Sequence, residues 1–298
     1  TATFRDLGGN LWVGYRNAGV QIISQNRIAY KEANDNALSD NTKGISILTM
    51  ATVGKHVLAG TGLRVFAYDE KNKHLDQTLF RDLFDSLPKP RQINLNNMMG
   101  YDDEHLWLVS EQQVLSCRIN NERIEVLAKS PLFKSGLGLG LKVENQLYVS
   151  SGKGCLLRFE FGKPQPELIR IPRPYFDHET KLAKLNDGNI LLFMRGMHLA
   201  VLSPDTGKIR EMKVTDRPRE GSLDPAFAKQ DSYGNVWLGT QRDGLYLMNK
   251  EKTRMHRVNI LNDVHIQALV EDTKRQGWVT TIRDVFFENF ESKQFLMN

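Results

Sequence analysis

Short apolar segments with alternating β-branched and aromatic residues run through the whole chain, separated by Gly, Asn and Asp. Alternation with a period of two predicts β-strands, because successive side chains of a strand point to opposite faces of a sheet. No apolar pattern with the helical period of 3.6 extends beyond about ten residues. The pattern therefore predicts an all-β protein.

One motif organises these segments. Gly9-Asn10-Leu11-Trp12-Val13-Gly14 is echoed by Gly234-Asn235-Val236-Trp237-Leu238-Gly239-Thr240, and an aspartate, Asp6 or Asp231, precedes each copy. Weaker copies fill the interval, so that the Trp slot falls at Trp12, Leu58, Trp107, Tyr148, Leu191, Trp237 and Trp278. Copies lie about 44 residues apart, which is typical of the four-stranded blades of a propeller.

The repeat predicts a seven-bladed β-propeller of four-stranded antiparallel blades, occupying 1–298 as a single domain. The expected blades cover residues 1–43, 44–92, 93–136, 137–177, 178–223, 224–263 and 264–298. In the sixth blade, strands A to D are expected at 225–230, 235–240, 245–248 and 255–260, and in the seventh at 265–272, 278–282, 285–288 and 293–297. Strand A is expected nearest the axis. We expect the first and seventh blades to close the ring by packing, without strand exchange.

The recurrence of the motif along the chain has a structural interpretation. Adjacent blades cover both faces of each sheet, so the aromatic side chains of the slot are expected in the core. The expected packing residues are Trp12, Trp107, Trp237 and Trp278. Gly14 and Gly239 end the second strand, where a missing side chain permits a tight turn or a close neighbouring backbone.

The wording Asp-x-x-Gly-Asn-Leu-Trp-Val-Gly resembles the two-component regulator propeller repeat, with two strong copies and five weaker ones. The second, fourth and fifth copies lack Trp in its slot, and the third has Asp102-Asp103-Glu104-His105 in place of the Gly-Asn turn. The resemblance implies the periplasmic ligand-sensing part of a Bacteroides-type hybrid two-component histidine kinase. Such a protein would carry an immunoglobulin-like domain, a membrane helix and cytoplasmic kinase parts elsewhere. Glycan breakdown products would be its signals.

Composition is ordinary for a globular domain. The 298 residues include 40 Lys+Arg and 35 Asp+Glu, a net charge of +5 that falls short of a nucleic-acid-binding tail. No apolar run reaches the roughly 18 residues of a membrane helix. Because Thr1 opens the chain without a Met or a leader, we expect a piece of a larger protein, attached to a membrane only through other segments.

Cys117 and Cys155 lack metal-ligand spacing, and buried free thiols are favoured over a disulfide.

Candidate ligand-binding residues come from the loops at one end of the predicted channel. The turns between strands B and C and the connections between blades are expected on the same face, where propellers usually carry function. The B-to-C turns supply Arg16, Lys153, Arg195, Arg242 and Arg283, and the connections supply Arg173, Tyr175, His178, Arg217 and Arg219. Guanidinium groups along one arc would suit carboxylate or sulfate groups, and an aromatic ring would suit a sugar. The alternative interpretation makes Arg242-Asp243 and Arg283-Asp284 salt bridges within turns, and the other arginines solvated surface charges.

Three function classes stay open. The resemblance favours a non-catalytic sensor that recognises an oligosaccharide, with neighbouring propeller and immunoglobulin-like domains as partners and no cofactor. A docking or homodimerising scaffold is the second class. Inter-blade connections could supply it with an exposed apolar patch of Phe80, Phe84, Leu87, Leu132 and Phe133, although such residues more often fold back to cover blade edges. A carbohydrate-active hydrolase or lyase is the third. Against it, the seven histidines show no metal spacing, Asp187-Gly188-Asn189 and Asp35-Asn36 lack a full EF-hand loop, and no GxSxG motif occurs.

Overall fold

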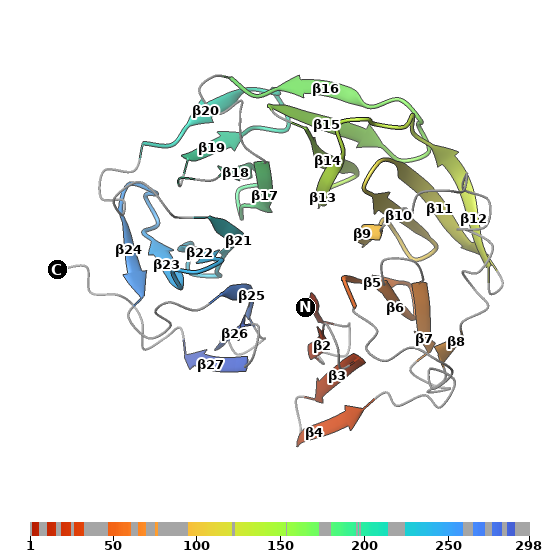
Figure 1. The fold of residues 1–298 in the computed structure, drawn as a ribbon, viewed down its shortest axis with the longest axis horizontal. Helices are drawn as coiled ribbons and strands as arrows, with labels where there is room; N and C mark the ends of the chain where they lie inside the picture. Colours follow the sequence, from red (N-terminus) through yellow and green to blue (C-terminus); the bar gives the residue numbers. More distant parts are fainter. Residues whose placement is uncertain are drawn as a thin grey trace. The chain divides into compact units, whose positions relative to one another are not determined.

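The fold is seen in a computed structural model of the chain. It describes residues 2–5, 11–15, 19–24, 27–32, 47–60, 65–69, 75–76, 95–120, 123–152, 154–172, 180–194, 196, 198–213, 224–258, 265–271, 276–281 and 285–289. Strands are the only extended regular elements in these ranges, which confirms the predicted all-β class (Figure 1). No helix in this part of the chain is long and apolar enough to cross a membrane.

The strands form seven antiparallel sheets, in each of which neighbours in the chain are neighbours in the sheet. The first three sheets hold β1 (Ala2–Arg5), β2 (Leu11–Tyr15), β3 (Gly19–Ser24) and β4 (Arg27–Glu32); β5 (Thr49–Val53), β6 (His56–Gly60), β7 (Val65–Asp69) and β8 (Leu75–Asp76); β9 (Leu95–Gly100), β10 (His105–Ser110), β11 (Val114–Asn120) and β12 (Arg123–Lys129). The fourth and fifth hold β13 (Leu137–Val143), β14 (Gln146–Ser151), β15 (Cys155–Glu160) and β16 (Glu167–Arg170); β17 (Thr180–Lys184), β18 (Ile190–Met194), β19 (His198–Leu202) and β20 (Ile209–Glu211). The last two hold β21 (Pro225–Gln230), β22 (Val236–Thr240), β23 (Leu245–Met248) and β24 (Met255–Val258); β25 (Ile266–Glu271), β26 (Gln276–Thr281) and β27 (Val285–Asn289).

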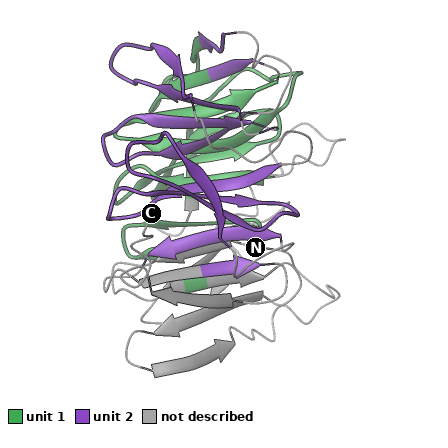
Figure 2. Ribbon diagram, turned by 90° about the vertical axis from the view of Figure 1, so that its left-hand side faces the viewer, with its two compact units in different colours: residues 1–152, 157–168 green, residues 153–156, 169–298 purple. Residues whose placement is uncertain are grey.

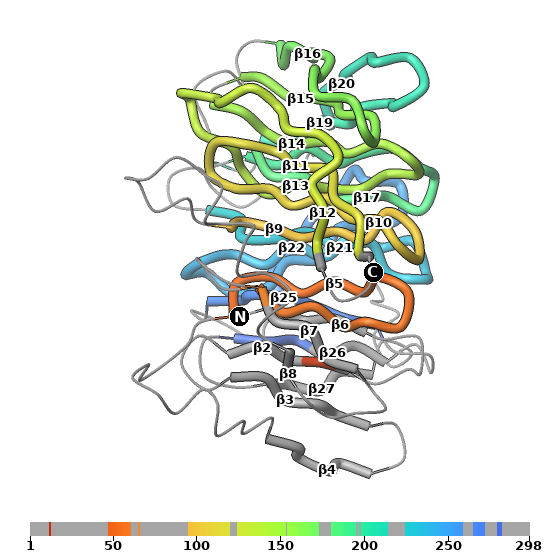
Figure 3. The backbone as a smooth tube through the Cα atoms, turned by 90° about the vertical axis from the view of Figure 1, so that its right-hand side faces the viewer, coloured from red at the N-terminus to blue at the C-terminus, as the bar shows by residue number. Residues whose placement is uncertain are grey.

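The chain divides into two compact units, coloured separately in Figure 2. Unit 1 comprises Thr1–Gly152 and Leu157–Leu168, and unit 2 comprises Lys153–Leu156 and Ile169–Asn298. Within unit 1 the first strands of successive sheets, β1, β5, β9 and β13, lie side by side, and within unit 2 so do β17, β21 and β25. Figure 3 follows the chain of unit 1 through the sheet β9 to β12. Each sheet has four antiparallel strands except the last, for which three are described, and sheets stacked through their first strands in this way are the blades of a β-propeller. The outermost strand expected at 293–297 lies outside the described residues.

From the second to the sixth blade, the second strand is almost wholly buried, with at most one residue of each strand partly exposed. All five residues of β22 are buried, because neighbouring sheets cover both of its faces. Val236 and Leu238 pack in a cluster with Leu191 of β18, whereas Trp237 packs on the other side with Ile266 of β25. Alternation along one strand thus supplies two cores.

The same division occurs in unit 1. Leu106 and Leu108 of β10 pack with β5 and β6, and Trp107 packs with β13 and β14. The exposed fractions of Trp12, Trp107 and Trp237 are 5%, 0% and 2%, so these three rings belong to the core; the side chain of Trp278 lies outside the described residues. Of the glycines that end second strands, Gly239 has a clear steric reason. A Cβ there would lie 2.0 Å from Cε1 of Phe227.

Several first strands carry a β-bulge close to their start. The register leaves one extra residue in β9, β21 and β25, at Asn96, Ala226 and Gln267 respectively. A bulge increases the local twist and re-aims side chains at the rim of a sheet. These rims are the ends at which the first strands begin.

Candidate functional site

In the sixth blade, the turn between strands B and C and the start of strand A share one edge. Pro225, the first residue of β21, pairs with Thr240, the last residue of β22. The backbone N–H of Gln241 donates to the carbonyl of Asp224 at 3.0 Å, which ties the turn to the connection that enters the blade. The expectation that both loop types lie at one edge is therefore confirmed for this blade.

Arg242 lies exposed in this turn. The backbone N–H and the carboxylate of its neighbour Asp243 both have partners. The Asp243 N–H donates to Oγ1 of Thr240 at 2.9 Å, which closes the turn. The Asp243 carboxylate lies 3.0 Å from Nη2 of Arg257, and the hydroxyl of Tyr246 donates to its other oxygen. The interpretation of Arg242-Asp243 as a salt bridge is thus wrong, because the partner of Asp243 is Arg257 of β24. No described residue forms an ion pair with the Arg242 guanidinium.

Three further ionisable residues gather where β17, β21 and β25 begin. Lys181 of β17 donates from Nζ to the carbonyl of Pro225 at 2.8 Å, so its ammonium lies over the start of β21. His265 directly precedes β25. Burial lowers the pKa of His265 below its usual value, and the positive charge of Lys181 lowers it further, while the Asp224 carboxylate raises it. Lys181, Asp224 and His265 thus stand at or beside the first residues of three strands that lie side by side.

Two buried oxygens at the same strand ends have no hydrogen-bond partner among the described residues. They are Oγ1 of Thr180, a residue with 2% of its surface exposed, and Oε1 of Gln267, the bulged residue of β25. Buried polar atoms are normally satisfied by protein, water or ligand. This edge of unit 2 therefore offers positive charge together with unfilled hydrogen-bonding capacity.

The structure does not place the other predicted site residues. Arg16, Lys153, Arg173, Tyr175, His178, Arg195, Arg217, Arg219 and Arg283 lie outside the described residues, as do Phe80, Phe84 and Leu87. Leu132 is 55% exposed, whereas Phe133 turns inward and meets Phe159 edge to face at 6.4 Å between ring centroids. Sequence reasoning missed Lys181, Asp224 and His265. Their positions in the repeat could have identified them, since each lies at or beside the first residue of a strand A.

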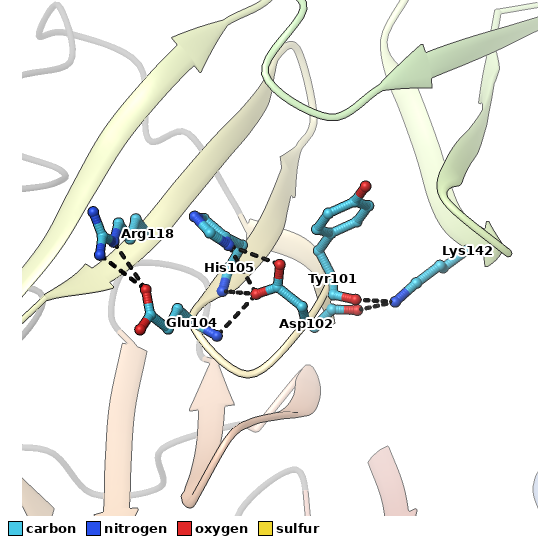
Figure 4. A network of polar contacts seen from close by, with 7 residues as sticks. Tyr101, Asp102, Glu104, His105, Arg118 and Lys142 are labelled. Carbon is cyan, nitrogen blue, oxygen red and sulfur yellow. Dashed lines mark hydrogen bonds and ion pairs between the residues drawn. The ribbon is translucent and has the colours of Figure 1, made fainter.

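A second polar cluster lies in the third blade, in the turn between β9 and β10, at the edge where β9 ends (Figure 4). The Asp102 carboxylate accepts hydrogen bonds from the N–H groups of Glu104 and His105, both at 2.9 Å, and lies 2.8 Å from Nδ1 of His105. Burial opposes ionisation of Asp102, but these hydrogen bonds hold its pKa below the usual value. Glu104 pairs with Arg118 at 2.9 Å. The Asp102 carboxylate thus closes the turn between β9 and β10, and the Glu104 carboxylate ties this turn to β11.

Lys142 joins this turn to the fourth blade. Its Nζ donates to the carbonyls of Gly100 and Tyr101 at 3.0 and 2.5 Å, and lies 5.3 Å from the centroid of the Tyr101 ring (Figure 4). With two carbonyl acceptors and an aromatic face, the Lys142 ammonium is engaged in linking the two blades. Across the described residues, no group of three or more His, Cys, Asp or Glu side chains is arranged to hold a metal ion. The polar cluster of Figure 4 is therefore assigned to the fold.

No model of a known protein family and no curated protein matches the sequence. Solved structures do match the fold. The extracellular domain attributed to the hybrid two-component system BT4673 from B. thetaiotaomicron superposes with a TM-score of 0.72 at 16% identity, over 96% of this chain and 37% of that one. The chain thus spans little more than a third of that domain's length.

Two other similar structures come from differently named proteins. The β-propeller domain of Cps50 (Swd1) from Myceliophteria thermophila has a TM-score of 0.72 at 13% identity, covering 97% of this chain and 96% of that one. Virginiamycin B lyase from Staphylococcus aureus has a TM-score of 0.72 at 13% identity, covering 96% and 93%. A propeller shared at such low identity establishes the architecture and leaves function to the site.

Proposed function

We propose that this chain is the extracytoplasmic ligand-sensing module of a hybrid two-component sensor histidine kinase. Its ligand is an oligosaccharide with acidic groups, bound at the edge of unit 2 that carries Arg242. The propeller itself is non-catalytic, and the kinase activity belongs to other parts of the full-length protein. Ligand binding would shift an equilibrium between arrangements of the sensor, which is how a binding module transmits a signal.

The observation that carries the proposal is the Arg242 turn. Asp243 and Arg257 neutralise one another, so among the described residues no carboxylate pairs with the exposed Arg242, which stands in a turn that three hydrogen bonds fix in shape. Because the backbone of the turn is already fixed, binding of a carboxylate or sulfate has to order only the Arg242 side chain itself. The Gly-Asn-Leu-Trp repeat and the likeness to the BT4673 domain support the sensor context and an extracytoplasmic, periplasmic location.

Calorimetric titration tests the site. Oligogalacturonate and a sulfated disaccharide serve as acidic probes, and a neutral oligosaccharide of the same length serves as the reference. We expect salt-sensitive binding of an acidic probe, and a loss of at least about fivefold in affinity for Arg242→Ala, because one charge-assisted hydrogen bond disappears. Arg254→Ala is the matched control, since Arg254 is also exposed but lies in the turn between β23 and β24, at the opposite edge of the same sheet.

Two results would sink the proposal. One is the absence of binding for every oligosaccharide. The other is an equal loss in Arg242→Ala and Arg254→Ala, which would indicate diffuse charge attraction. Mass spectrometry of the titrated sugars checks turnover in the same samples. A cleaved product would replace the sensor interpretation with that of a hydrolase or lyase.

A docking scaffold is the second candidate, and exposed leucines in unit 1 favour it. Leu48, Leu132 and Leu139 are 44%, 55% and 58% exposed. Leu48 precedes β5, Leu132 lies in the connection that enters β13, and Leu139 belongs to β13. A second copy of this propeller would cover such a surface. Light scattering distinguishes the candidates, because a scaffold would be dimeric and Leu132→Ser with Leu139→Ser would make it monomeric.

A further inference from the structure

We propose that Lys181, Asp224 and His265 form an anion subsite whose occupancy is coupled to the uptake of one proton. The ligand group is a sulfate or a carboxylate. The subsite deepens the proposed function, because it lies at the same edge of unit 2 as Arg242. It assigns to that site a pH dependence and residues that the repeat motif does not contain.

The geometry rests on three consecutive blades. Strands β17, β21 and β25 lie side by side and begin at this edge. The bond from Lys181 Nζ to the Pro225 carbonyl spans the fifth and sixth blades, and the bond from Gln241 N to the Asp224 carbonyl brings the Arg242 turn to the same place. His265 is half-buried at the start of the next blade. The groups are therefore held by backbone that the sheets position, which favours a preformed site.

The charges of Lys181 and Asp224 cancel one another when His265 is neutral, which leaves Arg242 as the positive charge at this edge. The described charged groups at these strand starts are Lys181 of β17, with one positive charge, and Asp224, the residue before β21, with one negative charge. Arg242 supplies a further positive charge from its turn, and the nearby Asp243 is neutralised by Arg257. Protonation of His265 turns the balanced pair into a positive centre. An anion would then meet Lys181 and the imidazolium together.

The direction of the coupling follows from the environment of His265. Burial and Lys181 both lower the pKa of His265, so the free protein holds this imidazole neutral at neutral pH. A bound anion compensates the positive charge of Lys181 and favours the imidazolium. Binding therefore draws a proton from solution, and affinity rises as pH falls. Uptake of one proton corresponds to about a tenfold change per pH unit between the free and bound pKa values.

Histidine NMR of the wild-type propeller tests this without any sugar. The probe is inorganic sulfate, compared with chloride at the same ionic strength, and the readout is the titration midpoint of the His265 ring. We expect sulfate to raise this midpoint by at least about 0.5 pH relative to chloride. His256 is an internal control, because burial also lowers its pKa but it lies on the outermost strand β24. Its midpoint should be the same in both salts.

Two variants separate the subsite from general electrostatics. In chloride, Lys181→Met should raise the His265 midpoint and Asp224→Asn should lower it, because each removes one of the opposing charges. In sulfate, Lys181→Met should lose the additional rise. Equal midpoints in sulfate and chloride, or a sulfate response that survives Lys181→Met, would overturn the subsite.

Failure of this inference differs from failure of the sensor proposal. An acidic oligosaccharide that binds equally at about pH 5.5 and pH 7.5, with unchanged affinity in His265→Gln, contradicts the proton coupling and leaves the sensor intact. A sulfate response at His265 without binding of any oligosaccharide supports the subsite and contradicts the sensor. An affinity that rises about fivefold or more at the lower pH, and does so only with His265 present, supports both.

Discussion

The carboxylate of Asp231 accepts the hydrogen bond of the Trp237 indole, with 2.8 Å between Oδ2 and Nε1. The same carboxylate accepts from the N–H groups of Tyr233 and Asn235 at 3.0 and 2.8 Å, and from Nδ2 of Asn235 at 3.1 Å. Asp231 is 1% exposed. One side chain therefore closes the turn from strand A to strand B and anchors the core aromatic ring, which gives the repeat motif its physical meaning.

Asp231→Ala should be among the most destabilising substitutions in the sixth blade. It leaves the buried Trp237 N–H and two backbone donors of the turn without their acceptor, at a cost of about 2–4 kcal/mol. Urea unfolding followed by tryptophan fluorescence measures the loss. Asp205→Ala is the control, because Asp205 is exposed in the turn between β19 and β20, and it should change stability by less than about 0.5 kcal/mol. Equal effects of the two substitutions would refute the anchoring role.

The third blade replaces this anchor with aromatic packing. Six residues before Trp107 stands Tyr101, and Nε1 of Trp107 has no hydrogen-bond partner among the described residues. Tyr101 meets Trp107 edge to face at 5.1 Å and stacks on Phe161 at 4.4 Å, between centroids. In the third blade the Tyr101 ring thus covers the Trp107 indole, whereas in the sixth blade the Asp231 carboxylate binds the equivalent indole of Trp237.

Tyr101→Ala should cost about 3 kcal/mol, because it opens a cavity between two rings. Tyr101→Phe keeps the ring and is expected to stay within about 0.5 kcal/mol of the wild type. Thermal unfolding of both variants is the measurement. A large loss in Tyr101→Phe would show that the hydroxyl matters more than the packing, against this account.

The repeat made most strands predictable, whereas contacts between blades could not be predicted from it. The expected strands 225–230 and 245–248 agree with β21 and β23 to the residue, since Gly, Asn and Asp turns bound each of them. Seen from the sequence, Lys142 is a polar residue near the end of a strand. Its link to Gly100 and Tyr101 depends on how two blades pack, which period and spacing do not encode.

The candidate site shows the same division. The offset from the Trp slot correctly identified Arg242 as an exposed turn residue, because turn geometry is local. It assigned Asp243 the wrong partner, since Arg257 reaches it from a strand 14 residues along the chain. Lys181 belongs to β17 and His265 directly precedes β25, so only the stacking of β17, β21 and β25 brings them to one edge.

The two cysteines should differ sharply in reactivity. Burial raises the pKa of the Cys117 thiol to about 12, so it has almost no thiolate at neutral pH. Cys155 is partly exposed, and both thiols are free. A disulfide reagent such as DTNB should therefore modify Cys155 in the native protein and Cys117 only after unfolding. Cys155→Ser should abolish the native reaction, and a remaining fast reaction would contradict the burial of Cys117.

Stability should fall as the solution becomes mildly acidic, and two histidines account for part of the loss. Burial lowers the pKa values of His256 and His265 in the folded state, so the unfolded chain binds more protons below its own histidine pKa of about 6.5. The full contribution is present above that pH and is lost progressively as pH falls toward the folded-state pKa values. The lowered carboxyl pKa values of Asp102 and Asp187 act only in stronger acid, below about pH 4.

The double variant His256→Gln, His265→Gln isolates this effect. Urea unfolding at several pH values between about 5 and 8 should show a shallower decline for the variant than for the wild type, because the variant has no proton to take up at these positions on unfolding. The single variants divide the effect between the outer strand β24 and the proposed subsite. Added sulfate should reduce the acid loss in His256→Gln, which retains His265, and should leave it unchanged in His265→Gln. Parallel pH profiles for wild type and double variant would contradict the buried, neutral state of both rings.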